Sequence, residues 1–518
     1  MADCSLWALA ATSGHLRRAL LPTRPMQTGT LISLAAYFIL MLAIGLYAWR
    51  KATQSSEGYL LGGRNLSPAV AALSAGASDM SGWLLLGLPG ALYAAGLVEA
   101  WIGIGLFAGA LVNWIVVAPR LRQQTEELGN ALTIPQFLSN RFPSHAVALR
   151  VISAVIIVTF FSVYTASGLV AGGKLFETSF AALFDIAAVS DYTLGLWITA
   201  GVVLAYTMVG GFLAVSLTDF VQGLIMVTAL VVMPLVVMFG PGGASGASIV
   251  AVPQEGFLSL TQGLTFIGFL SAVTWGLGYF GQPHIIVRFM ALRSVKDVPA
   301  ARNIGMTWMG VCLIGTIGTG LAGRAYIERN GMVLEDPETI FIVLAETLFH
   351  PLVTGFLLAA LLAAVMSTIS SQLLVASSSL TEDFYRLFLR KQASERESVN
   401  IGRLSVLAVA LVAIVIAGDP ESQVLGLVAN AWAGFGAAFG PLIVLALTWD
   451  RMTGAGALAG LVTGAVVVIG WIALGWNGSF MGGPGVYEII PGFVLAWLAL
   501  WLVSKATGQD RETALRSA

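Results

Sequence analysis

The stretch that decides the fold is Ala77-Ser78-Asp79-Met80-Ser81-Gly82-Trp83. It places a carboxylate, hydroxyls and a helix-weakening glycine in the middle of an apolar segment that runs from about residue 68 to residue 96. A charged side chain at the centre of a bilayer costs about 2.5–3.5 kcal/mol even on insertion scales, so such a residue usually has a function. Non-helical backbone at that depth must be covered by protein or line a water-filled cavity. We therefore interpret the stretch as one half of a broken-helix binding site in a secondary transporter.

The composition indicates a membrane protein. The chain of 518 residues is 57% hydrophobic and 10% charged, whereas a soluble domain is about 25% charged. Apolar runs recur along the chain, and each is long enough to cross about 30 Å of hydrocarbon as a helix. The net charge of −1 argues against nucleic acid as a partner. Two distant cysteines predict no disulfide framework, and four scattered histidines predict no metal cage.

Thirteen apolar segments are predicted to span the membrane. They cover residues 30–49, 68–95, 98–118, 149–172, 193–211, 218–239, 263–282, 304–326, 352–378, 402–418, 424–447, 455–475 and 486–504. With the first connecting loop inside, only Lys174, Arg324 and Arg329 fall outside, apart from three arginines before Met26. Because Lys and Arg are enriched in cytoplasmic loops, we expect the N-terminus outside and the C-terminus inside. Asp219 is expected to cap the start of the segment 218–239.

The N-terminal residues 1–25 contain Arg17, Arg18 and Arg24 after a weak apolar patch. A signal peptide has the opposite order, with the positive charge before the apolar core. One hypothesis is that Met26 is the true start of the protein, and a short presequence is the alternative.

The segment 263–282 has an interruption like that of residues 77–83. It contains Trp275-Gly276-Leu277-Gly278-Tyr279-Phe280-Gly281-Gln282-Pro283, in which each glycine weakens a helix by about 1 kcal/mol and the proline by about 3 kcal/mol. Paired interrupted helices point to the binding site of an inverted-repeat transporter. Close helix packing is the alternative reason for the glycines. The polar and aromatic residues at both breaks favour a binding site.

The segment 352–378 carries a run of hydroxyls within Ala363-Ala364-Val365-Met366-Ser367-Thr368-Ile369-Ser370-Ser371. Hydroxyl and carbonyl oxygens suit a small hard cation. Bonding of the hydroxyls to carbonyls of the preceding turn is the alternative. Combined with free carbonyls from residues 77–83, a Na⁺ site is the preferred interpretation. For Tyr164, in the segment 149–172, lining of a cavity and burial in the core are equal alternatives.

Four motifs together resemble the proline-transporting branch of the solute:sodium symporter family, over roughly residues 30–506. They are Gly63-Arg64, the run from Ser74 to Trp83, the run from Trp275 to His284, and the run from Ala364 to Thr368. The resemblance implies an all-α polytopic fold with a LeuT-type five-plus-five inverted repeat. It also implies an N-terminal extension at 1–29, an extra span at 30–49, repeats at 68–239 and 263–447, two C-terminal spans within 455–504 and a cytoplasmic tail at 505–518.

The resemblance further implies a function and a set of site residues. The expected function is import of L-proline by alternating access across a bacterial inner membrane, with Na⁺ as the co-transported ion and no cofactor. The implied sodium ligands are the carbonyls of Ala77, Met80 and Ala364 and the hydroxyls of Ser367 and Thr368. The implied substrate residues are Ser81, Gly82, Trp83, Tyr164, Trp275, Tyr279 and Ser371. Asp79 and Arg64 are implied in coupling.

Three alternatives compete with this interpretation. The same scaffold could carry another small zwitterion or a monocarboxylate. A membrane-embedded enzyme would need a nucleophile–base pair or a metal cluster at membrane depth, and the sequence offers neither. A channel would not concentrate its solute. We expect a transporter that needs the lipid bilayer and no obligatory protein partner.

Overall fold

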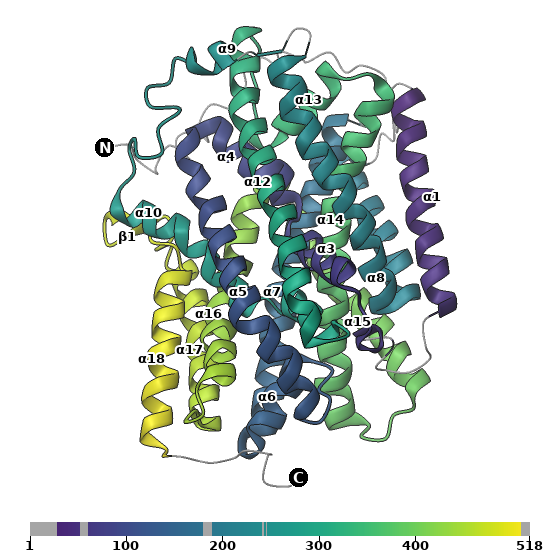
Figure 1. The fold of residues 1–518 in the computed structure, drawn as a ribbon, viewed down its shortest axis with the longest axis vertical. Helices are drawn as coiled ribbons and strands as arrows, with labels where there is room; N and C mark the ends of the chain where they lie inside the picture. The colour runs from purple at the N-terminus through teal and green to yellow at the C-terminus, as the bar shows by residue number, and fades with distance from the viewer. Residues whose placement is uncertain are drawn as a thin grey trace.

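The chain forms a bundle of long helices whose axes run mostly along one direction (Figure 1). The computed structural model describes residues 28–51, 58, 61–179, 189–240, 243–244 and 246–508. The hypothesis on Met26 and the tail beyond residue 508 therefore fall outside the described residues.

The helices of the first half are α1 Thr28–Lys51, η3 Gly62–Arg64, α3 Pro68–Asp79, η4 Trp83–Gly87, α4 Leu88–Ala95, η5 Leu97–Glu99, α5 Ala100–Glu127, α6 Ile134–Arg141, η6 Pro143–His145, α7 Ala146–Ser179 and α8 Asp191–Phe239. The second half contains α9 Gly246–Val250, α10 Phe266–Val273, η7 Thr274–Gly281, α11 Pro283–Ala291, η8 Val295–Asp297, α12 Val298–Arg329, η9 Pro337–Thr339, α13 Ile340–Leu348, α14 Pro351–Ser378, η10 Ser379–Leu389, α15 Glu395–Ile416, α16 Val424–Thr448, α17 Gly454–Ala473 and α18 Ile489–Ala506. A small antiparallel pair, β1 Ser479–Phe480 and β2 Gly483–Pro484, precedes α18.

Ten helices of the described chain are long and apolar enough to cross a membrane, or eleven if the bent pair α3–α4 counts as one span. The predicted segments 193–211 and 263–282 are not among them, although both fall on helices. The fold is thus a mostly helical, multi-pass membrane bundle.

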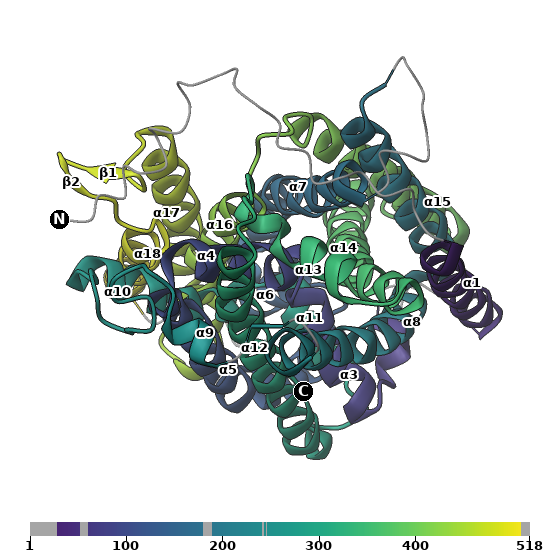
Figure 2. The ribbon, with the colours of Figure 1, turned by 90° about the horizontal axis from the view of Figure 1, so that it is seen from above.

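The helices α14 and α16 form the centre of the bundle, and α1 and α18 lie at its edge (Figures 1 and 2). In the most apolar window of α14, 83% of the residues are buried, against 28% for α1 and for α18. A helix surrounded by protein can carry hydroxyls that lipid would penalise. The hydroxyl run of α14 therefore lies where polar groups can be used.

The predicted break at residues 77–83 is confirmed. The hydroxyl of Ser67 accepts a hydrogen bond from the amide of Val70 at the start of α3, as an N-cap does. The helix ends at Asp79, because Met80 has a ψ of 75°. The chain resumes as η4 and α4 after a bend of 62°.

Two features of the chain differ from the predicted segments. The segments 193–211 and 218–239 lie on two helices, labelled together as α8, that meet at a kink at Gly211, whose φ of 59° and ψ of −161° are not helical. The second of these helices begins at the kink and not at residue 218. Asp219 therefore lies inside a helix, and the prediction that it caps a helix start is wrong. The segment 263–282 consists of the short helix α10 and the 3-10 helix η7, and α11 begins after Gln282 at a ψ of 105°.

Candidate ion and substrate site

The first part of the site forms where α14 crosses the break at the end of α3. The hydroxyl of Ser367 donates to the carbonyl of Ala77 at 2.8 Å, and that of Thr368 lies 3.4 Å from the same oxygen. Both hydroxyls also lie 3.1 Å from the carbonyl of Ala364. Four of the five predicted sodium ligands thus converge. The fifth, Met80, is buried at the break itself.

The second part of the site surrounds Asp79. Its carboxylate accepts a hydrogen bond from the hydroxyl of Tyr279 through Oδ2. Its backbone carbonyl accepts from the indole of Trp83 at 3.1 Å and from the hydroxyl of Tyr164 at 3.2 Å. Three predicted aromatic residues from three elements therefore meet at one residue. The Oδ1 atom of Asp79 has no hydrogen-bond partner among the described residues.

The remaining aromatic residues lie between η7 and α16. The indole nitrogen of Trp432 donates to the carbonyl of Trp275 at 2.7 Å. The rings of Trp432 and Tyr279 meet edge to face with centroids 5.0 Å apart. Gln282 also donates to the carbonyl of Trp432, at 3.1 Å. These contacts hold Trp275 and Tyr279 of η7 against a buried face of α16.

The glycines of η7 serve close packing. A Cβ at Gly278 would overlap the indole of Trp432, one at Gly281 would overlap the carbonyl of Phe435, and one at Gly276 would overlap a carbonyl of α5. Near the first break, a Cβ at Gly82 would lie 2.9 Å from the Cβ of Ala171 in α7. Small residues let helices approach closely in membranes. The packing alternative for the η7 glycines is therefore supported.

A polar cluster that sequence reasoning missed lies one helical turn from Thr368. Arg288 and Asp219, both fully buried, form an ion pair at 3.2 Å. Ser371 accepts from Arg288 at 2.5 Å, and Ser74 donates to Asp219 at 2.7 Å. Ser371 was expected beside the substrate, but its described partners are these charged groups. The signal available in the sequence was a charged residue within each of two apolar stretches.

Arg64 is buried at one end of α11, away from the aromatic residues. Its guanidinium donates to the carbonyls of Met290 at 3.0 Å and Ala131 at 2.5 Å. A third contact joins it to the hydroxyl of Thr125 at 3.3 Å. Arg64 thus joins the chain before α3 to α5, to the loop before α6 and to α11.

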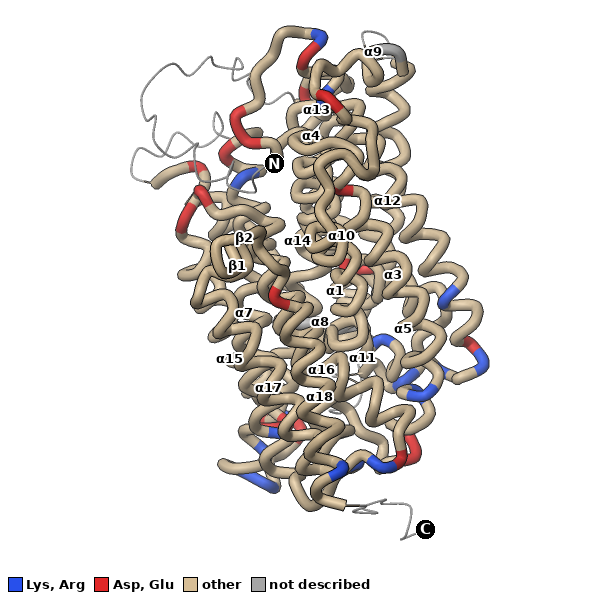
Figure 3. The backbone as a smooth tube through the Cα atoms, turned by 90° about the vertical axis from the view of Figure 1, so that its left-hand side faces the viewer, with Lys and Arg blue, Asp and Glu red and all other residues tan. Residues whose placement is uncertain are grey.

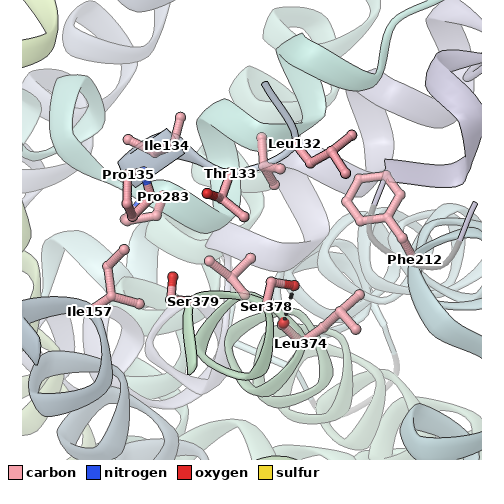
Figure 4. A pocket seen from close by; sticks show the side chains of 12 residues that line it. Leu132, Thr133, Ile134, Pro135, Ile157, Phe212, Pro283, Leu374, Ser378 and Ser379 are labelled. Carbon is pink, nitrogen blue, oxygen red and sulfur yellow. Dashed lines mark hydrogen bonds between the residues drawn. The ribbon is translucent and has the colours of Figure 1, made fainter. Parts of the chain in front are cut away.

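One cavity adjoins Asp79, and a second lies between α6, α7, α8, α11 and α14. The first is lined by Asp79, Tyr279 and Asn113 among others, and the side-chain amide of Asn113 has no hydrogen-bond partner among the described residues. The second is lined by Pro283, Phe212 and Thr133, among others, which come from three different parts of the chain (Figure 4).

Two further ion clusters, also missed from the sequence, lie at opposite ends of the bundle. Near the second cavity, the buried Asp383 accepts from Thr133 at 3.0 Å and pairs with Arg150 at 2.9 Å. At the other end, Lys174 pairs with Glu338 at 2.8 Å. The carboxylate of Glu338 also accepts from the first two amides of α16, both at 3.0 Å, where the helix dipole favours a negative charge.

Comparison with known proteins places this geometry in a family. A model of the "Sodium:solute symporter family" matches residues 59–464. The chain belongs to this family, whose members are sodium-coupled transporters. Among its relatives are proteins of Staphylococcus aureus strains JH9 and NCTC 8325 named "Sodium/proline symporter". Each is 52% identical over 488 residues, which cover 92% of this chain and 93% of the relative.

Two solved structures share the fold. A Na⁺-coupled sialic acid symporter in a substrate-bound outward-open state matches with a TM-score of 0.75 at 17% identity, over 93% of this chain and 98% of the other. A nucleobase-cation-symport-1 family transporter in a closed conformation matches with a TM-score of 0.56 at 14% identity, over 89% and 97%. The bundle is therefore the fold of LeuT-type symporters.

Proposed function

We propose that this chain imports L-proline together with Na⁺ by alternating access. The observation that carries the proposal is the meeting of two hydroxyls of α14 with the carbonyl of Ala77, where α3 ends. The relatives at 52% identity that are named sodium/proline symporters support proline as the solute.

The proposed sodium ligands are the carbonyls of Ala77, Met80 and Ala364 and the hydroxyls of Ser367 and Thr368. Oxygens of this kind suit a small hard cation. Because the hydroxyl hydrogens rotate freely, Ser367 and Thr368 can turn from donating to carbonyls toward presenting lone pairs to the ion. The ion then bridges α3 and α14, which belong to different parts of the bundle.

The proposed proline site uses Ser81, Gly82, Trp83, Tyr164, Trp275 and Tyr279. Proline is a zwitterion with an apolar ring, so it needs both polar groups and aromatic walls. Amides freed at the first break suit its carboxylate, and an aromatic face suits its ammonium group. Ser371 is proposed to contribute from the adjoining polar cluster, through the hydroxyl that accepts from Arg288.

Asp79 and Arg64 are proposed to couple the two solutes. Asp79 touches both parts of the site, since it follows the sodium ligand Ala77 by two residues and binds Tyr279 through its carboxylate. Sodium entering beside this carboxylate would compensate its charge. A single charge moving down 100 mV supplies about 2.3 kcal/mol, or about fiftyfold accumulation.

The proposed topology has thirteen spans in a bacterial inner membrane, with the N-terminus outside and the C-terminus inside. Residues 68–239 and 263–447 are the proposed inverted repeats, 30–49 is an extra span, and 455–504 holds two more. Lys and Arg gather toward the lower end of the bundle in Figure 3, which is the end at which α6 lies in Figure 1. This supports the placement of that end inside.

The chain is proposed to be a transporter and not an enzyme. The competing function is symport of another small zwitterion or of a monocarboxylate. The test measures uptake of labelled proline by the purified protein in proteoliposomes, in the presence of an excess of each of a panel of unlabelled amino acids and monocarboxylates. We expect L-proline alone to compete strongly. Stronger competition by another solute would overturn the assignment, and uptake that stops at the diffusive equilibrium level would favour a channel.

A further inference from the structure

The C-terminal spans reach the aromatic residues of the site through Tyr487. This residue lies between β2 and α18, and its buried ring stacks on the indole of Trp275. The ring centroids are 5.3 Å apart and the planes differ by 26°. The short helix α10 lies beside the upper end of α18 in both views (Figures 1 and 2).

Two hydrogen bonds hold Tyr487 in this position. Its amide donates to the hydroxyl of Ser271 in α10 at 3.3 Å. Its own hydroxyl donates to the carbonyl of Ala429 in α16 at 3.0 Å. Trp275 is in turn fixed to α16 by the bond from Trp432. Tyr487 is therefore held to α10 through its backbone amide and to α16 through its hydroxyl.

We propose that Tyr487 is a positioning residue for substrate binding, which acts through Trp275. Its ring covers one face of the indole and fixes the side-chain rotamer, so that only the opposite face and the edge can meet the substrate. This inference rests on the proposed role of Trp275 in the proline site. It gives the C-terminal spans, which lie outside the proposed repeats, a direct part in substrate affinity.

The test compares two substitutions at one position. Tyr487→Phe keeps the stacked ring and loses only the hydroxyl, whereas Tyr487→Leu loses the ring. An aromatic pair contributes an amount that corresponds to about 3- to 10-fold in an equilibrium constant. At saturating Na⁺ we expect Tyr487→Leu to raise the KM for proline by that factor, with Tyr487→Phe within about twofold of wild type.

A matched control and a double variant complete the experiment. Phe480→Leu removes another stacked ring before α18, which lies 4.9 Å from the ring of Trp471, and should leave the KM unchanged. In a Trp275→Ala background, Tyr487→Leu should raise the KM no further. KM does not depend on the amount of protein in the membrane, so poor folding of a variant changes only the maximal rate.

Three results would overturn the inference. They are an unchanged KM in Tyr487→Leu, equal increases in the leucine and phenylalanine variants, and a full additional increase in the Trp275→Ala background. An unchanged KM in Trp275→Ala alone would instead contradict the proposed function of Trp275 in the proline site, on which this inference rests.

Discussion

The two broken spans use their breaks differently. At the end of α3, the break frees a backbone carbonyl, and two hydroxyls from α14 occupy it. In η7, the glycines bring the backbone against α5 and α16, while the aromatic side chains of Trp275 and Tyr279 form a buried wall. The first break thus provides oxygen ligands, whereas the second provides close helix packing and a wall of aromatic side chains. Glycine in a membrane helix does not by itself mark an unwound binding segment, and its neighbours must be considered.

The largest expected effect is at the first break. Ser367→Ala combined with Thr368→Ala should abolish sodium-stimulated uptake of proline, because two of the proposed ligands disappear together. Ser377→Ala is the control, since its buried hydroxyl lies on the same helix and donates to the carbonyl of Gly402. If uptake by the double variant is still stimulated by Na⁺, the ion binds at another site.

The next effect concerns packing at the second break. Gly278→Ala forces a methyl group into the indole of Trp432, and overpacking of this kind costs about 1–3 kcal/mol. We expect a clearly lower melting temperature of the purified protein. Gly426→Ala in α16 meets nothing within 4 Å and should not lower it. Equal stability of both variants would contradict the packing role of the glycine.

Asp79→Asn separates ion binding from substrate binding. Interactions with a charged group contribute about 1.5–3 kcal/mol, so we expect the half-saturating Na⁺ concentration to rise by about 10- to 100-fold. The KM for proline at saturating Na⁺ should change much less. Glu99→Gln, which removes a carboxylate outside both breaks, serves as the control. Equal changes in both constants would argue against an ion role for Asp79.

The smallest effect is expected at the aromatic wall. Trp275→Ala should raise the KM for proline about tenfold, which corresponds to about 1.4 kcal/mol, and should leave the half-saturating Na⁺ concentration within about twofold. Uptake kinetics at varied proline and fixed saturating Na⁺ measure this. A change in the half-saturating Na⁺ concentration without a change in the KM for proline would contradict the assignment of Trp275 to substrate binding.

Much of the site could be predicted because its signals are local. A carboxylate beside a glycine, and paired hydroxyls within an apolar run, are unusual enough in a membrane segment to be noticed in the sequence. The resemblance to the family then indicated that Ala77 and Ser367 meet, although 290 residues separate them. The break in α3 followed from the same signals.

The missed features depend on partners far away in the sequence. Asp219 looked like a helix cap because the second helix of α8 was predicted to begin at residue 218, whereas it begins at the kink at Gly211. Its pairing with Arg288, 69 residues away, has no local pattern. The same holds for Lys174 with Glu338 and for Tyr487 with Trp275. Such contacts are set by how the helices pack, and a single sequence does not record that packing.

The most direct test of the central claim, that Na⁺ held at the first break drives proline uptake, is a sodium-jump experiment. Proteoliposomes that contain only this protein are diluted into labelled proline with either Na⁺ or choline outside, at a fixed inside-negative potential. We predict accumulation far above equilibrium with Na⁺, its absence with choline, and its loss in the Ser367→Ala, Thr368→Ala double variant. Equal uptake in Na⁺ and choline would contradict the account.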